Sequence, residues 1–105
     1  MSNDVTNNEA EGQYELRVDG QLVGVAEYVS NGAVLEFTHT EINRALQGQG
    51  LGTILVEAAL DDTRRRSLMV LPHCWFVRDH IATNVDTYLS LVPEDQRAQF
   101  RLPSA

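Results

Sequence analysis

Several residue types and patterns are scarce in this sequence, and each shortage excludes a class of protein or site. There is one cysteine, Cys74, so no internal disulfide can form, and one neighbouring histidine does not supply the four ligands of a structural zinc site. No apolar run approaches the roughly 20 residues that a membrane span needs, and residues 1–12 lack the basic start and apolar stretch of a secretory signal. We therefore expect a cytoplasmic protein with no metal ion and no membrane partner.

Positive charge is also scarce, which restricts the partners that the protein can bind. Lys and Arg together number 8 against 15 Asp and Glu, and the formal net charge is -7. Proteins that bind nucleic acid carry clustered basic residues, so we expect no nucleic acid partner. An anionic cofactor could still bind where backbone N–H groups and a few arginines outweigh the overall negative field.

The length and composition are those of one folded domain. At 105 residues, with 43% hydrophobic and 22% charged residues, the chain is close to the average soluble domain. Residues 1–12 are polar with no hydrophobic period, so we predict a disordered N-terminal tail there. Residues 93–105 are polar and weakly patterned, which predicts a C-terminal tail. The domain itself then covers residues 13–92.

Apolar residues alternate through the first part of this domain, which predicts strands. Residues 14–18 form the first strand, and Asp19-Gly20 supplies a tight hairpin turn. Residues 22–29 form the return strand, Asn31-Gly32 repeats the turn signal, and a third strand covers residues 33–39. Together these segments predict an antiparallel three-stranded meander.

The hydrophobic period changes from 2 to about 3.6 at Gly48, which predicts an amphipathic helix. Its expected apolar stripe consists of Leu51, Ile54, Leu55 and Ala58. The helix ends at Arg64-Arg65-Arg66, whose cations suit the negative end of the helix dipole. A contact between these arginines and the phosphates of a cofactor is the alternative.

The rest of the domain continues the mixed pattern. Residues 67–71 form a short apolar run of strand length, which Pro72 ends. A second helix from about residue 73 to 82 follows, and residues 86–92 again have helical spacing. The fold class is therefore α+β, with a meander, a helix, a further strand and C-terminal helices.

Three glycines alternate at positions 48, 50 and 52, just before the apolar stripe begins. A helix N-terminus carries about four N–H groups without intrahelical partners and roughly half a positive charge. Glycines let an anion approach this backbone, and no Ser, Thr, Asp or Asn lies between the glycines to cap the helix. The segment predicts an anion site, with a turn that merely needs glycine as the alternative.

The residues around the last glycine exclude one phosphate-binding motif and disfavour a second. A nucleotide-triphosphate loop needs Lys and then Ser or Thr at this point, whereas Thr53-Ile54 follows Gly52. A dinucleotide fingerprint needs G-x-G-x-x-G within a βαβ unit, whereas this chain has G-x-G-x-G after a meander.

The segment Gln47-x-x-Gly50-x-Gly52 resembles the Q/R-x-x-G-x-G/A motif of the GCN5-related N-acetyltransferases, whose successive backbone amides hold the pyrophosphate of coenzyme A. Three motifs in order are similar to the short YjdJ-type branch of this superfamily: EFTHTEI at residues 36–42, QGQGLG at 47–52 and LPHCWFV at 71–77. The resemblance covers about residues 13–92. It implies a single compact domain of the GNAT fold that takes acetyl-CoA or coenzyme A as its acyl-donor substrate, with no metal.

The resemblance also implies which residues bind the cofactor. They are Thr40, Ile42, Arg44, Gln47, Gly48, Gln49, Gly50, Leu51, Gly52 and Thr53. The family often has Arg-Gly-Arg-Gly where this chain has Gln47-Gly48-Gln49-Gly50, so two charged phosphate contacts are missing. Arg44 is the nearest replacement, and we expect weaker affinity for coenzyme A.

Two side chains are candidates for catalysis. His39 ends the third strand, and its neutral imidazole could take the proton of an amine. It shares a strand face with Leu35 and Phe37, so a hydrogen-bonded core histidine is the alternative. Cys74 opens a helix, and the resemblance places it near the thioester as a nucleophile or proton donor, with a buried apolar role as the alternative.

Other nearby side chains are expected to play smaller parts. Glu36 lies on the strand face opposite His39 and is a minor catalytic candidate. Trp75 and Phe76 are expected in the core rather than against a ligand.

Three functions remain open from the sequence. The first is an N-acetyltransferase that moves an acetyl group to a primary amine, by direct attack in a ternary complex or through acetyl-Cys74. The second is a non-catalytic acyl-CoA-binding or regulatory module, and the third is an interaction domain that binds no coenzyme A. The tight hairpin at Asp19-Gly20 stands where larger relatives insert helices, so the acceptor pocket should be incomplete. We expect a monomer or weak homodimer and a cationic acceptor, such as a protein lysine or a polyamine.

Overall fold

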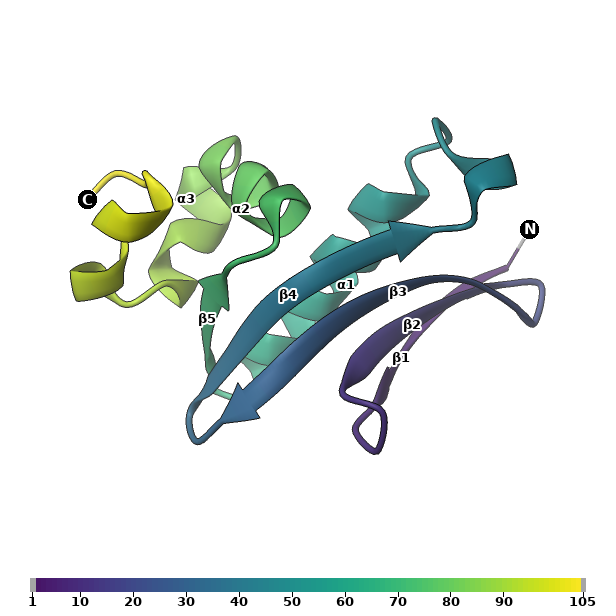
Figure 1. The fold of residues 1–105 in the computed structure, drawn as a ribbon, viewed down its shortest axis with the longest axis horizontal. Helices are drawn as coiled ribbons and strands as arrows, with labels where there is room; N and C mark the ends of the chain where they lie inside the picture. The colour runs from purple at the N-terminus through teal and green to yellow at the C-terminus, as the bar shows by residue number, and fades with distance from the viewer. Residues whose placement is uncertain (1, 105) are drawn as a thin grey trace.

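The computed structural model describes residues 2–104, which form one five-stranded sheet and a set of short and long helices (Figure 1). The sheet has the strand order β1-β2-β3-β4-β5. The strands are β1 (Asn3–Asn8), β2 (Gln13–Val18), β3 (Gln21–Asn31), β4 (Val34–Ile42) and β5 (Met69–Pro72). The α-helices are α1 (Leu51–Arg65), α2 (Trp75–Ala82) and α3 (Val85–Tyr88). Short 3-10 turns lie at Arg44–Leu46, Leu89–Leu91, Glu94–Gln96 and Ala98–Phe100.

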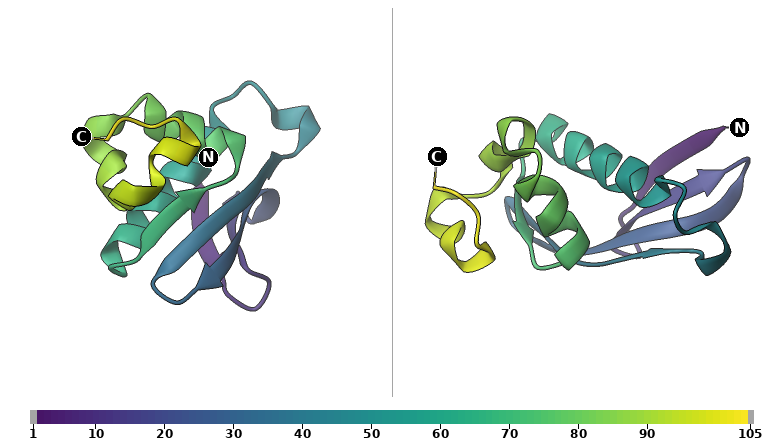
Figure 2. Two further views of the ribbon diagram at one scale, coloured as in Figure 1. Left: turned by 60° about the vertical axis from the view of Figure 1, so that its left-hand side comes forward. Right: turned by 90° about the horizontal axis from the view of Figure 1, so that it is seen from above.

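The sheet combines a meander with one crossover, which confirms the α+β domain. Strands β1 to β4 are antiparallel neighbours, whereas β5 pairs parallel to β4. Helix α1 makes the crossover between them and lies along one face of the sheet (Figure 2). Pro72 is tolerated in β5 because this strand is at the edge of the sheet, where a missing N–H breaks no second ladder. In residues 2–104 no helix has both the length and the apolar composition needed to cross a bilayer.

The core lies between α1 and the sheet. Tyr14, Tyr28 and Phe37 form an aromatic cluster on three neighbouring strands, with ring centroids 5.5 to 6.2 Å apart. The buried side of α1 consists of Leu51, Leu55, Val56, Ala59, Leu60 and Thr63. The predicted apolar stripe was wrong in phase at Ile54, which is 38% exposed, because the buried side follows the i, i+4 row through Leu51 and Leu55.

The disordered tail predicted for residues 1–12 is wrong where the structure describes it, since Asn3–Asn8 pairs with β2 along its whole length. Met1 lies outside the described residues. An edge strand needs only its backbone pairs and one half-buried apolar side chain, here Val5. The polar side chains are also bonded, because Tyr28 Oη donates to Asn7 Oδ1 at 2.6 Å and Asn8 Nδ2 donates to a Glu15 oxygen at 3.0 Å.

The segment predicted as a C-terminal tail packs against the domain. Arg97 is buried, and its guanidinium donates from Nε to Val92 O at 2.9 Å and from one terminal nitrogen to Ser104 O at 2.8 Å. Arg78 of α2 donates to Phe100 O at 2.8 Å and to Arg101 O at 2.9 Å. Ala105, the last residue of the predicted tail, lies outside the described residues. Two arginines thus fix the carbonyl groups of this segment.

Candidate functional site

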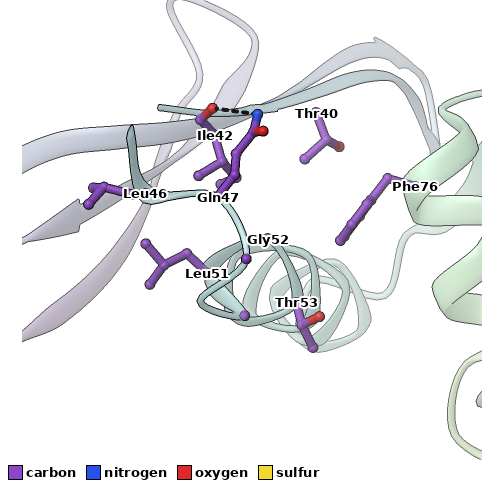
Figure 3. Close-up of a pocket in the computed structure, with 10 residues that line it drawn as sticks. Thr40, Ile42, Leu46, Gln47, Leu51, Gly52, Thr53 and Phe76 are labelled. Atoms are coloured by element: carbon purple, nitrogen blue, oxygen red, sulfur yellow. Dashed lines mark hydrogen bonds between the residues drawn. The ribbon is translucent and has the colours of Figure 1, made fainter. Parts of the chain in front are cut away.

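A cavity of about 380 Å³ opens where the end of β4, the glycine turn, the start of α1 and the first turn of α2 meet (Figure 3). The lining residues are Thr40, Ile42, Leu46, Gln47, Gly48, Gly50, Leu51, Gly52, Thr53 and Phe76. None of these side chains is charged. Gln47 closes one side, where its Nε2 donates to Ile42 O at 3.5 Å.

The cavity exists because β4 and β5 diverge. The two strands pair only as far as Phe37 and Pro72. Beyond that point Cys74 N donates to Phe37 O at 2.7 Å and the chain turns into α2, whereas β4 continues to Ile42. Within residues 2–104, the last residues of β4 therefore have no neighbouring strand on the side of α2.

A bulge in β4 decides which side chains face the cavity. Tyr28 pairs with Phe37 and Glu27 pairs with His39, so Thr38 is an extra residue opposite β3. The extra residue reverses the alternation of side chains. Thr40, opposite the buried Ala26, therefore faces the covered side of the sheet, whereas His39 faces the other side.

The glycine turn presents backbone donors to the cavity. Gly48 has φ of +85° and Gly50 has φ of +77°, in the left-handed region that L side chains avoid. Gly50 is the N-cap of α1, and no side chain of the described residues caps this helix. Among residues 2–104 no hydrogen bond is made by the N–H groups from Gly48 to Thr53. These donors and the dipole of α1 favour an anion, as the alternating glycines predict.

Position 52 requires glycine for a different reason, which is a close contact with a neighbouring side chain. Gly52 is an ordinary helical residue, and a Cβ atom there would lie 2.9 Å from Cζ of Phe76. The Phe76 ring therefore rests directly on the first turn of α1 (Figure 3). The expectation that Trp75 and Phe76 are core residues is wrong, because their exposed fractions are 70% and 44%. The start of α2 turns both side chains outward, while Val77 and Ile81 take the buried face.

Most residues expected to bind the cofactor line this cavity. They are Thr40, Ile42, Gln47, Gly48, Gly50, Leu51, Gly52 and Thr53. Gln49 is exposed and does not line it, and Arg44 lines a neighbouring groove of about 370 Å³ beside β3. Leu46 and Phe76 also line the cavity and were not predicted from the sequence. Phe76 lies two residues after Cys74 in the LPHCWFV motif, which was the available signal.

The two catalytic candidates lie on different faces of the sheet. Cys74 is buried, with 7% of its surface exposed, and its Sγ is 3.2 Å from Oγ1 of Thr40. The His39 side chain is 55% exposed, and its Nε2 is 3.9 Å from a Glu41 oxygen. No hydrogen bond joins His39 to Cys74 in the described part of the chain. Glu36 instead lies against the His73 ring, where its carboxylate can accept a hydrogen bond from Nε2 at 3.0 Å.

The phenols with raised pKa values lie outside the cavity. Burial, with a hydrogen bond to Asp62, raises the pKa of Tyr14 to about 12. Burial and the charges of Asp61 and Glu57 raise the pKa of Tyr88 to about 12. Both phenols therefore stay protonated at neutral pH. Across residues 2–104 no three His, Cys, Asp or Glu side chains are arranged to hold a metal ion.

Comparisons with known proteins identify the family and agree with the fold. The model of the GCN5-related N-acetyl-transferase family matches residues 13–91. The solution structure of a GCN5-like N-acetyltransferase candidate from Staphylococcus aureus superposes with a TM-score of 0.63 at 22% identity, over 89% of this chain and 91% of that one. The ribosomal-protein-S18-alanine N-acetyltransferase of Escherichia coli gives a TM-score of 0.53 at 23% identity, over 75% of this chain. The present chain spans 50% of that enzyme. A search of curated proteins gives no match.

Proposed function

The chain belongs to the GCN5-related N-acetyltransferase family, and from that premise we propose that it transfers the acetyl group of acetyl-CoA to a primary amine. The cavity beside the glycine turn is the proposed site for the donor. We further propose that it belongs to the short YjdJ-type branch, works in the cytoplasm and is a monomer or weak homodimer.

The observation that carries the proposal is the set of free N–H groups on residues of the cavity wall, namely Gly48, Gly50, Leu51, Gly52 and Thr53. A pyrophosphate placed there would accept several charge-assisted hydrogen bonds and lie at the positive end of α1. No carboxylate lines the cavity to oppose it. Because no Lys or Arg lines it either, the cavity offers no cation–phosphate ion pair for salt to screen.

The thioester would then lie toward Thr40 and Cys74, at the other side of the cavity. The amine nitrogen attacks the carbonyl carbon, the C–S bond breaks, and coenzyme A leaves as a thiolate that takes up a proton. Thr40 and Cys74 form a hydroxyl–thiol pair that could polarise the carbonyl or protonate the sulfur. We propose direct attack, because a thioester is already activated and a bound amine needs no second thioester.

His39 would serve this reaction from the opposite face of the sheet. We propose that the acceptor amine enters through the opening between β4 and the end of β5, where the exposed imidazole can take its proton. A protein lysine or a polyamine suits the acidic surface. His39 and Cys74 lie apart, on different faces of the sheet, and this observation favours a second candidate function. That function is an acyl-CoA-binding module without acetyl transfer.

Titration with coenzyme A followed by NMR tests the site. We expect the amide signals from Gln47 to Thr53 to move, because the free N–H groups start at Gly48 and Gln47 lines the same cavity. Amides of the β3–β4 hairpin, at the opposite end of β4, serve as the internal control (Figure 1). Signals that stay still at millimolar coenzyme A in the folded protein would refute the proposal. Acetyl transfer to a panel of amines then separates the enzyme from the binding module.

A further inference from the structure

Phe76 separates two hollows on the same side of the molecule. Its ring lines the cavity at the glycine turn, and it also lines a second hollow of about 230 Å³ together with Asp79, His80 and Thr83. These four residues follow the i, i+3, i+4, i+7 spacing, so they form one stripe along α2. The second hollow is therefore a groove along α2 that begins at the edge of the first cavity.

The exposure of the Phe76 ring is not explained by packing within the fold. The ring touches Gly52 and leaves 44% of the residue exposed, between the two hollows. Trp75 is more exposed, yet the Arg78 guanidinium lies over its ring at 5.4 Å from the centroid, and it lines neither hollow. Of these two exposed aromatic residues, Phe76 is therefore the one that presents its ring beside the unpaired N–H groups of α1.

We infer that Phe76 is the stacking platform for the adenine base of coenzyme A, with the groove along α2 as its adenosine site. The inference rests on the proposed function, which puts the pyrophosphate at the N–H groups of Gly48 to Thr53. Since Phe76 touches Gly52, the ring lies beside those phosphates, where a base joined to them through one ribose can reach it. Every nucleobase has a π-face, so an aromatic side chain can hold the base without a hydrogen bond.

The polar groups of the groove fit a nucleoside better than a further phosphate. Asp79 is half exposed, and its Oδ1 lies 2.8 Å from a terminal guanidinium nitrogen of Arg78. The carboxylate can at the same time accept a hydrogen bond from the exocyclic amino group of adenine. His80 is held by Glu57 at 3.0 Å between Nε2 and Oε2. Two carboxylates near the groove oppose a 3′-phosphate, so dephospho-coenzyme A should bind at least as tightly as coenzyme A.

The test compares two ligands on three variants by calorimetry. Coenzyme A carries the adenosine, and 4′-phosphopantetheine lacks it. Phe76→Leu keeps an apolar side chain but removes the π-face. It should therefore raise the Kd for coenzyme A by about 10- to 100-fold and the Kd for 4′-phosphopantetheine by less than about two-fold. Phe76→Trp should preserve the preference for coenzyme A. Trp75→Leu, the matched control on the neighbouring residue, should leave both affinities unchanged.

The outcomes separate this inference from the proposed function. If Phe76→Leu raises the Kd for both ligands by the same factor, the ring contacts the pantetheine arm, and the inference that it stacks on adenine is overturned. If the wild-type protein binds neither ligand and the amides of the glycine turn do not move, the proposed function fails with it. Should Phe76→Leu fail to fold, a folded Phe76→Trp that loses the preference for coenzyme A overturns the inference as well.

Discussion

Replacing Gly50 by alanine tests whether the glycine turn binds phosphate or only shapes the chain. Gly50 has φ of +77° at the N-cap of α1, and Gly32 has φ of +64° in the β3–β4 hairpin. A Cβ atom at either position meets no other atom within 4 Å. Alanine at each position therefore adopts a left-handed conformation without a clash, which costs about 1–2 kcal/mol. We expect both variants to lose this much stability, or roughly 4–16 °C in Tm for a domain of this size.

Binding should distinguish the two variants, although their stabilities should not. Gly50 lines the cavity, so its new methyl group would separate the ligand from at least one N–H donor. A hydrogen bond to a charged group contributes about 1.5–3 kcal/mol, so the Kd for coenzyme A should rise about 10- to 100-fold in Gly50→Ala. Gly32 lies at the far end of β4, so Gly32→Ala should keep the wild-type Kd (Figure 1).

Thermal unfolding and isothermal titration calorimetry on the two variants make the comparison. If Gly50→Ala and Gly32→Ala lose equal stability and Gly50→Ala keeps the wild-type Kd, the proposal that this turn binds phosphate is refuted, because the glycine would then serve only the turn. A much larger loss of stability in Gly50→Ala than in Gly32→Ala would show that the N-cap position costs more than backbone strain alone. The Kd of the folded fraction would still decide the question.

Three further predictions concern single side chains. The eight Lys and Arg residues are all arginine, so an acetyl group found on the intact protein in the absence of an acceptor cannot lie on lysine. Direct attack predicts that the wild-type protein carries no acetyl group on Cys74 and that Cys74→Ala keeps measurable activity. An acetyl adduct on the wild-type protein that is absent from an inactive Cys74→Ala variant would instead establish transfer through Cys74. Hydrogen bonds from Gln13 and then Asn8 lower the pKa of Glu15, so Glu15→Gln should cost about 1–2 kcal/mol of unfolding free energy at pH 7. This stabilisation is present above the unfolded-state pKa and is lost as pH falls through the lower folded-state pKa, so urea unfolding at several pH values should show the difference disappear in acid, and a constant difference would contradict the reasoning. Gly52→Ala should destabilise by about 1–3 kcal/mol through its clash with Phe76, and Phe76→Ala should relieve most of that loss in a double-mutant cycle, whereas additive losses would place the clash elsewhere.

The sequence predicted the parts of the fold that depend on local periodicity. Period-2 alternation from Tyr14 found β2 and β3, and the glycine run found the start of α1. Strand β1 was missed because it is polar and is held by backbone pairing, which leaves no hydrophobic pattern.

The site was predicted where it depends on the backbone, and Thr40 was expected there from the family resemblance, whereas the strand face of His39 was predicted wrongly because it depends on register. The free N–H groups follow directly from alternating glycines before a helix. The bulge at Thr38 shifts Thr40 to the cavity and His39 to the other face, and a one-residue insertion in pairing leaves no mark in a single sequence. Phe76 was misplaced because an aromatic residue on a short helix is more often buried.

The parallel pairing of β4 with β5 has a consequence for the order in which the molecule assembles. The meander forms through hairpins whose paired strands are close in the chain. Val34 pairs with Met69 across a segment that includes the whole of α1. Contacts of such long sequence separation carry a larger loop-closure entropy and form slowly. The two walls of the cavity come from opposite sides of this closure, namely β4 before it and α2 after it. We therefore expect the ability to bind coenzyme A to appear last during refolding, so that ligand binding reports the completed chain rather than the early meander.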